Sequence, residues 1–364
     1  MTKIKLTAYQ ADNGACYGYR LYNPLNTIQS HDENREVWDI RITVRYEPQD
    51  LEASDAIILQ RQIDGSAFAN AISARRRAGT RVIYETDDDL FNVPWWNPFY
   101  EHFQDAAFRQ NFGFFLEECD AIFVSTEHLK KVYSRYNDQI YVLPNSIDPN
   151  FAIPRFGNNR IPVIGWAGSG THRADFERMQ PALARLAQDP DLRIRLFWYP
   201  DFSGPSVQQV PWVDWSSYYQ CLALSDFDIG LAPLAEHIFN RSKSNIRYLE
   251  YAMAGTPVIA SRVGPYAESI VHGKTGLFVD DDDAWEDTIR GLLRDEDLRH
   301  RLADNAKNDV LTRFNIHNNY VLWENAIRAI CAREPKTTRR RFKLVPTNLE
   351  VGYMPARFLL PRAS

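Results

Sequence analysis

The sequence predicts an α/β fold made of two doubly wound domains in tandem. Strand-like apolar runs alternate with helix-like segments through residues 1–145, and the alternation restarts at residue 160 and continues to residue 317. This pattern is typical of parallel sheets with helices on both faces. Between the halves, residues 143–159 are rich in Pro, Asn and Gly and lack periodicity, so we expect a linker at 146–159. In such Rossmann-like domains ligands lie at the carboxyl ends of the strands, so we expect the chemistry in a central cleft that the two domains face.

In the first half, β-branched and aromatic runs predict six strands. They cover residues 3–9, 38–44, 54–60, 81–85, 121–125 and 139–144. Helices are expected at 66–78, where Gly79 supplies a C-cap, and at 99–118.

In the second half, five apolar runs predict strands. They cover residues 161–167, 192–199, 227–234, 256–263 and 276–279. The expected helices are 174–187, 216–224, 243–254, 265–271 and 284–294, and residues 295–333 are expected to be helical throughout.

The composition excludes several classes of protein. A net charge of -5 and a pI near 5.9 offer no basic excess for nucleic acid. The four cysteines are far apart and form no C-x-x-C pair, so neither a zinc site nor a disulfide framework is expected. We find no signal peptide and no apolar run long enough to span a bilayer, so we expect a cytoplasmic protein with reduced thiols.

The stretch KSNIRYLEYAMAGTPVIAS, residues 243–261, raises the sharpest question. Lys243 stands at the start of the expected helix, where the macrodipole disfavours a cation. At about 100° per residue, Lys243, Arg247 and Glu250 share one stripe of that helix. A solvated stripe with an Arg247–Glu250 pair is the simpler interpretation. The alternative is an anion site, in which Lys243, Ser244, Asn245 and Arg247 hold a diphosphate and Glu250, two turns along, holds ribose hydroxyls.

The glycine-rich loop IGWAGSGTH follows the first strand of the second half. Its glycines do not have the G-x-G-x-x-G spacing, so a nicotinamide-dinucleotide site is not supported. One interpretation is a tight strand-to-helix turn. The other is a second set of phosphate donors, which consists of Gly168, Ser169, Gly170, Thr171 and His172.

Two loops of the first half also follow strands. In ADNGACYGYR, Gly14 gives a flexible turn and Arg20 could reach an anion, although an ordinary loop is an equal alternative. In YETDDDLF, three crowded carboxylates, Asp87, Asp88 and Asp89, predict either a metal site or a turn and helix cap. The sequence HGKTG lacks the first glycine of a P-loop, and neither H-E-x-x-H nor G-x-S-x-G occurs.

Taken together, these motifs resemble a known family. FNRSKSNIRYLEYAMAGTPVIASRVGPYAESIVHGKTGLFV, residues 239–279, strongly resembles the donor-binding region of retaining bacterial GT-B glycosyltransferases, the large group with mannosyl- and glucosyltransferases of surface polysaccharides. VLPNSIDPNF resembles the linker motif of that group. IGWAGSGTH and YETDDDLF resemble a subgroup tied to O-antigen or polysaccharide assembly.

The resemblance implies a GT-B fold and a nucleotide-sugar donor, with UDP- or GDP-sugars expected first. It implies that Lys243 binds the diphosphate and Glu250 the ribose, while Ser242 stands where the group often has another glutamate. It also implies an acceptor-side N-terminal domain, onto which a last helix at about 318–333 packs back. No tightly bound cofactor and no metal are expected. The resemblance also implies that the leaving phosphate can take the acceptor proton, so no protein base is needed.

We expect three catalytic residues: Lys243, His172 and, beside the reacting centre, Asp88. The expected acceptor is a glycan, a lipid-linked sugar or a small molecule. The basic tail, with Arg339 to Arg341 and Lys343, is either solvated or in peripheral contact with the inner face of a membrane. Two other functions stay open, a sugar-nucleotide epimerase of the same architecture and a non-catalytic scaffold of a carbohydrate complex.

Overall fold

The computed structural model describes residues 3–31, 36–45, 47–151, 161–168, 170–199, 201–211, 213–337 and 345. The chain divides into two compact units. Unit 1 consists of Met1–Pro144 and Ile316–Ser364, and unit 2 of Asn145–Asn315. Most of the expected linker, residues 152–159, and the basic cluster of the tail lie outside the described residues.

Unit 1 contains a six-stranded sheet in the order β2-β1-β3-β4-β5-β6, with every neighbouring pair parallel. The strands are β1 (Ile4–Tyr9), β2 (Trp38–Thr43), β3 (Ala56–Gln60), β4 (Arg81–Thr86), β5 (Ala121–Val124) and β6 (Ile140–Val142). The helices are α1 (Ala15–Tyr17), which continues as the π-turn η1 (Gly18–Tyr22), α2 (Asn23–Ser30), α3 (Pro48–Glu52), α4 (Gly65–Ala78), α5 (Tyr100–Gln104), α6 (Ala106–Glu118), α7 (Glu127–Tyr133) and α16 (Ile316–Cys331).

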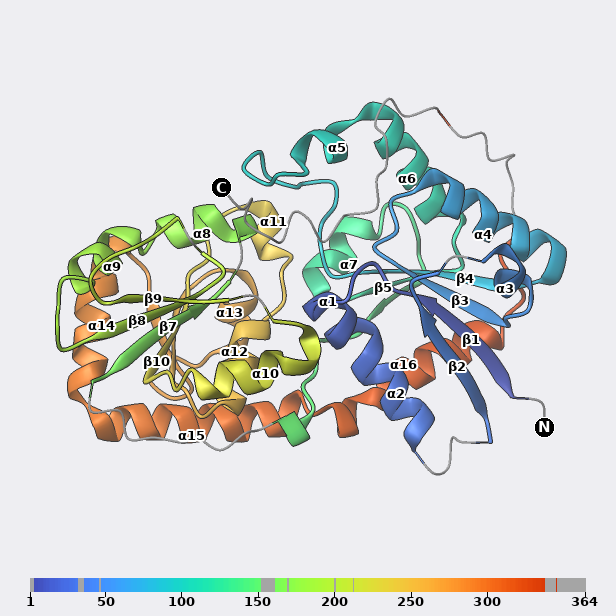
Figure 1. Ribbon diagram of the computed structural model, residues 1–364. Helices are drawn as coiled ribbons and strands as arrows, with labels where there is room; N and C mark the ends of the chain where they lie inside the picture. Colours follow the sequence, from blue (N-terminus) through green and yellow to red (C-terminus); the bar gives the residue numbers. More distant parts are fainter. Residues whose placement is uncertain are drawn as a thin grey trace. The chain divides into compact units, whose positions relative to one another are not determined.

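Helices cover both faces of this sheet (Figure 1). Because side chains alternate along a strand, Ile58 and Ile83 face one layer and Tyr84 faces the other. On the first face, the strands pack against α2 and against α16, whose Trp323 and Ile327 are buried. On the second face, Tyr84 contacts aromatic rings of α4 and α6.

Unit 2 repeats this architecture with a parallel sheet in the order β12-β11-β10-β7-β8-β9. Its strands are β7 (Val163–Ala167), β8 (Arg193–Phe197), β9 (Val207–Val210), β10 (Ile229–Ala232), β11 (Val258–Ser261) and β12 (Leu277–Val279). Its α-helices are α8 (Arg173–Glu177), α9 (Gln180–Leu186), α10 (Trp215–Leu224), α11 (Ile238–Arg241), α12 (Ile246–Met253), α13 (Gly264–Ser269), α14 (Trp285–Arg294) and α15 (Glu296–Arg313). Short turns of 3-10 helix are η3 (Pro149–Phe151), η4 (Gly170–His172) and η5 (Asp282–Ala284).

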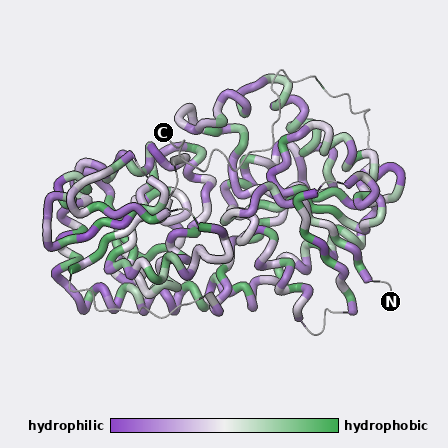
Figure 2. Tube along the Cα trace, viewed as in Figure 1, coloured by the Kyte–Doolittle hydropathy of each residue, from purple (hydrophilic) through white to green (hydrophobic). Residues whose placement is uncertain are grey.

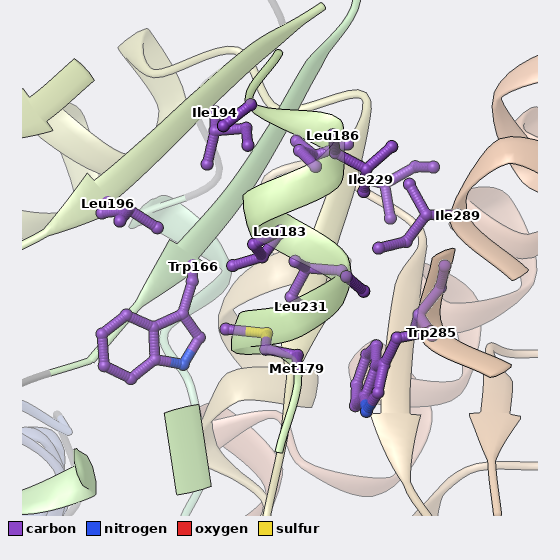
Figure 3. Close-up of a cluster of buried hydrophobic side chains, with 14 of the residues drawn as sticks. Trp166, Met179, Leu183, Leu186, Ile194, Leu196, Ile229, Leu231, Trp285 and Ile289 are labelled. Atoms are coloured by element: carbon purple, nitrogen blue, oxygen red, sulfur yellow. The ribbon is translucent and has the colours of Figure 1, made fainter. Parts of the chain in front are cut away.

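Two glycines of the unit 2 sheet make room for aromatic rings that pack against it. Gly230 and Gly165 are register partners on adjacent strands. A Cβ at Gly230 would lie 2.6 Å from the Tyr251 ring, and one at Gly165 would lie 2.2 Å from the Phe227 ring. These positions therefore need glycine to admit the two rings. The opposite face of the sheet carries the apolar cluster of Figure 3, in which Leu231 packs with residues of α9 and α14.

The fold class predicted from the sequence is confirmed. In Figure 2 the central strands of both sheets carry long hydrophobic stretches, as the apolar runs indicated. The short strand β9 was not predicted, because two glutamines occupy its middle. Three expected helices were too long: 99–118 and 174–187 each divide into two helices, and 295–333 is interrupted at Phe314 and Asn315.

Candidate functional site in unit 2

The loops that follow β7 and β10 lie at one edge of the unit 2 sheet. These strands are parallel neighbours, so their carboxyl ends meet there. The first loop carries residues 168–172, and the second runs through α11 to the start of α12. This edge brings together most of the site residues that the sequence predicted for this half of the chain.

A buried carboxylate, Asp175, joins the two loops. Its Oδ1 accepts hydrogen bonds from the Ala235 backbone N–H and from Asn240 Nδ2, both at 2.8 Å, and its Oδ2 lies 2.8 Å from His172 Nδ1. Burial lowers the pKa of His172, and the charges of Lys243 and Arg247 lower it further, against the opposing effect of Asp175. The imidazole is therefore neutral at pH 7. Sequence reasoning missed Asp175, although its i,i+3 spacing from His172 is a usable signal.

Lys243 lies in the turn between α11 and α12 and not in the first turn of a helix. The helix starts at Ile246 with Asn245 as its N-cap, so the expected start at 243 was wrong. The Lys243 ammonium lies 4.6 Å from the centroid of the Phe239 ring. Because Lys243 precedes the N-cap, it stays near the positive end of the helix without being part of its first turn. An anion held there would contact both the ammonium and the helix end.

The neighbours of Lys243 are fixed by side-chain hydrogen bonds. Ser244 Oγ accepts from Asn145 Nδ2 at 2.8 Å, and Asn245 Nδ2 donates to Ser269 Oγ at 2.9 Å. Ser242 is fully buried, and its hydroxyl lies 3.5 Å from the Ile238 carbonyl oxygen. Its short side chain and its burial mean that Ser242 does not supply a carboxylate surrogate to the site.

Glu250 is buried and forms a polar triad with Arg247 and Tyr218. The Tyr218 hydroxyl is 3.0 Å from Glu250 Oε2, and Arg247 Nη1 donates to that same oxygen and, at 2.7 Å, to the Tyr218 hydroxyl. Burial by itself lowers the pKa of Arg247, but Glu250 and Tyr218 outweigh it and hold that pKa above its ordinary value. The ion pair that the sequence offered as the simpler interpretation is therefore present. Tyr218, 32 positions before Glu250, carried no signal in the sequence.

The glycine-rich loop begins at Gly168, directly after β7. A Cβ at Gly168 would lie 2.0 Å from the Trp166 ring, so the position admits only glycine beside that indole. Ser169 lies outside the described residues. Gly170, Thr171 and His172 form the 3-10 turn η4 that leads into α8.

In unit 1, Arg20 is in a different environment from the one expected. Its guanidinium is fully buried, donates from Nε to Glu85 Oε1 at 2.6 Å and also donates to the Leu143 carbonyl oxygen. The charge is thus already compensated inside the protein, and the structure does not place Arg20 at an exposed anion site. Gly14 belongs to a turn in which its N–H donates to Asp12 Oδ1 at 2.7 Å.

The three aspartates after β4 have separate roles. Asp88 pairs with Arg61 at 3.4 Å, and Asp87 lies 4.0 Å from the same guanidinium. Asp89 accepts hydrogen bonds from the Phe91 N–H and from Asn92 Nδ2, which stabilises the turn that follows. Arg61, which has φ 44°, was missed because no pattern in the sequence indicates its contact with these carboxylates.

Among the described residues, no cluster of three or more His, Cys, Asp or Glu side chains could hold a metal ion. No helix there combines the length and the hydropathy needed to cross a bilayer.

Comparison with known proteins finds a family model that matches part of this region. Residues 246–309 match the family model of glycosyl transferases group 1, a segment that begins with α12 and contains Arg247 and Glu250. This segment, about a sixth of the chain, is similar to the group 1 glycosyl transferases. The fold of the chain is the GT-B fold of two Rossmann-like domains.

Curated relatives match over part of the chain. The D-inositol 3-phosphate glycosyltransferase of Corynebacterium urealyticum is 43% identical over 60 residues, which are 16% of this chain and 14% of that protein. The enzyme of the same name from Stackebrandtia nassauensis is 27% identical over 221 residues, or 52% of this chain and 49% of that one. The chain thus matches between about a seventh and a half of the length of these relatives.

Solved structures resemble this chain over nearly its whole length. A sucrose-phosphate synthase from Thermosynechococcus elongatus has a TM-score of 0.65 at 17% identity, with 91% of this chain and 100% of that chain covered. Anabaena HepE in complex with UDP and glucose also has a TM-score of 0.65, at 13% identity, with 90% and 100% covered. At such low identity these likenesses establish the fold.

Proposed function

We propose that the protein transfers a sugar from a nucleoside-diphosphate donor to an acceptor hydroxyl, with retention at the anomeric carbon, in the assembly of a surface glycan. The observation that carries the proposal is the gathering of Lys243, His172 and Arg247 at the carboxyl edge of a parallel sheet, beside a segment that matches the group 1 family. Neighbours of the same fold bind UDP and UDP-glucose, which supports a UDP-sugar as the first donor to test.

In this proposal the donor diphosphate lies between the 168–172 loop and Lys243. Breaking the bond to the sugar leaves negative charge on the diphosphate, and the ammonium and the helix end stabilise that charge as it develops. Neutral His172 donates from Nδ1 to Asp175, which leaves its Nε2 as an acceptor for a hydroxyl of the bound donor. The acceptor proton passes to the leaving phosphate oxygen, so no protein base is required for this step.

Glu250 is proposed to hold the ribose hydroxyls. Its carboxylate is buried in the triad with Arg247 and Tyr218, so it accepts from a ribose only where its second oxygen, Oε1, is reached. Asp88 is proposed to orient the acceptor in unit 1, where it pairs with Arg61 at 3.4 Å.

A thermal-shift panel of UDP, GDP, ADP and dTDP tests the proposal, followed by the sugar conjugates of the nucleotide that binds. We expect UDP or GDP to raise the Tm of the wild-type protein and transfer to occur with the matching sugar. Incubation with donor alone separates transfer from epimerisation, because an isomerised donor without acceptor would identify an epimerase. A chain that no nucleotide stabilises would not be a glycosyltransferase of this kind.

A further inference from the structure

Helix α10 of unit 2 begins at the candidate site with an aromatic residue. β9 is parallel to β8, so α10, which follows β9, starts at the same carboxyl edge of the sheet as the loops after β7 and β10. Trp215 is the first residue of α10 and is half-buried. A large ring therefore lies at this edge with part of its surface open to solvent.

Trp215 lies on the apolar face of α10. Three later residues at helical spacing on that face, Tyr218, Tyr219 and Leu222, are buried. The Trp215 ring is parallel to the Tyr218 ring within 11°, with the centroids 6.4 Å apart, and it meets the Tyr219 ring at 5.0 Å and 71°. The first of these geometries is an offset stack, which leaves part of the indole face uncovered while both contacts fix its plane.

Tyr218 joins this indole to the buried charge pair of the site. Its hydroxyl lies 3.0 Å from Glu250 Oε2 and accepts from Arg247 Nη1 at 2.7 Å. Figure 1 shows α10 beside α12, and the two helices meet at this side chain. Trp215 is therefore separated by a single tyrosine from the carboxylate proposed to hold the ribose.

The covalent structure of a nucleoside decides which part of the donor this ring meets. The base is attached to C1′ of the ribose, next to the carbon that carries the 2′-hydroxyl. A carboxylate that holds the ribose hydroxyls thus has the base within a few bonds of it, whereas the diphosphate and the sugar lie beyond C5′. Lys243, which is proposed to hold the diphosphate, precedes Glu250 by seven residues. A flat π-face beside Glu250 therefore suits the base, because every nucleobase has a π-face that stacks on aromatic rings.

We propose that Trp215 stacks on the nucleobase of the donor. This inference rests on the proposed function, because it assigns one part of the proposed donor to a residue that the proposed function leaves without a role. Tyr218 then acts twice: its hydroxyl bonds to the charge pair, and its ring holds the indole in place. Stacking recognises the face of a base and not its hydrogen-bonding edge, so Trp215 contributes to the binding of UDP and GDP alike.

Calorimetric titration of the full chain with UDP, GDP and inorganic pyrophosphate tests this inference. Pyrophosphate has the charge of the diphosphate but no base. We expect Trp215→Ala to weaken nucleotide binding about tenfold, as the loss of base–aromatic stacking does, and to leave pyrophosphate binding unchanged. Leu224→Ala, at an exposed apolar residue at the other end of α10, is the matched control and should bind UDP like wild type.

Two further variants separate stacking from simple packing. Trp215→Phe keeps a π-face and should bind UDP within about threefold of wild type, whereas Trp215→Leu is apolar without a π-face and should resemble Trp215→Ala. This comparison decides the matter where pyrophosphate binds too weakly to measure. The Tm of each variant shows that it is folded.

Three results would overturn the inference: wild-type UDP affinity in Trp215→Ala, an equal loss of UDP and pyrophosphate binding, or a Trp215→Leu protein that binds UDP as well as Trp215→Phe does. If UDP binds wild type and Trp215→Ala equally, this inference fails and the proposed function stands. If UDP binding depends on Trp215 but the sugar donor is only isomerised and never transferred, the proposed function fails and this inference stands. A wild-type protein that binds no nucleotide contradicts both.

Discussion

His172 Nδ1 lies 2.8 Å from Asp175 Oδ2, and the other oxygen of that carboxylate accepts two hydrogen bonds from the loop after β10. One buried side chain thus fixes the imidazole and the facing loop together. This arrangement makes Asp175 a positioning residue in the proposed donor site. It also means that the loops after β7 and β10 cannot shift independently without breaking these contacts.

Asp175→Asn should reduce donor affinity about tenfold, because an amide cannot accept from His172 and both loop donors in the same geometry. A merely structural role would not change the titration of His172. Since the Asp175 carboxylate raises the pKa of His172, its removal should lower that pKa further, which an NMR titration of the imidazole would measure. Asp201→Asn, at an exposed carboxylate, is the control. An unchanged His172 titration would contradict this role.

Lys243→Ala should reduce the transfer rate by about 100-fold or more, because it removes a cation from the leaving diphosphate. The fold should be little affected, since the ammonium lies over the Phe239 ring near the surface. Transfer rate, nucleotide affinity and Tm are measured together. Lys274→Ala, which removes an exposed lysine elsewhere in unit 2, should behave like wild type. Equal rates for Lys243→Ala and wild type would exclude Lys243 from the reaction.

Tyr218→Phe should weaken UDP binding and lower stability by about 1–2 kcal/mol, because it removes a hydroxyl bonded to both charges of the buried pair. Arg247 and Glu250 keep each other in this variant, so the protein should still fold. Nucleotide titration and denaturant unfolding measure the two effects. Tyr219→Phe, on the same helix, supplies a phenol control, because the Tyr219 ring packs against Trp215 and Tyr218. A Tyr218→Phe protein with wild-type affinity would show that the triad does not shape the ribose site.

The sequence predicted most of the strands because each is a short β-branched run between turn residues. It could not set the start of α12: Lys243 and Ser244 fit a helical pattern, but Asn245 bonds to Ser269, 24 residues away, and the helix begins after it. Propensity is a weak prior that such tertiary contacts override.

The candidate site was predictable where its residues follow strands or share a helix, as Lys243, Arg247 and Glu250 do. Its partners from distant segments were not. Asp175 joins Ala235 across 60 positions, and Arg20 meets Glu85 across 65. A single sequence shows that a cation or a carboxylate is present, but the fold alone decides whether it faces a ligand or another side chain.

The last prediction concerns the buried pair of Arg20 and Glu85. Burial raises the pKa of Glu85 from 4.5 to about 7, although the positive charge of Arg20 opposes this. The folded state therefore binds a proton that the unfolded chain releases near pH 4.5, and stability from this group is lost as the pH rises towards 7. A pKa difference of this size corresponds to about 3 kcal/mol. Glu85→Gln, which resembles the protonated acid, should match wild type near pH 4 and exceed its unfolding free energy by up to about 3 kcal/mol above pH 7. Urea unfolding at both pH values measures this.

Glu52→Gln, at a surface carboxylate, controls for general charge effects. A Glu85→Gln protein that is less stable than wild type at pH 8 would mean that the attraction of Arg20 exceeds the cost of burying the charge.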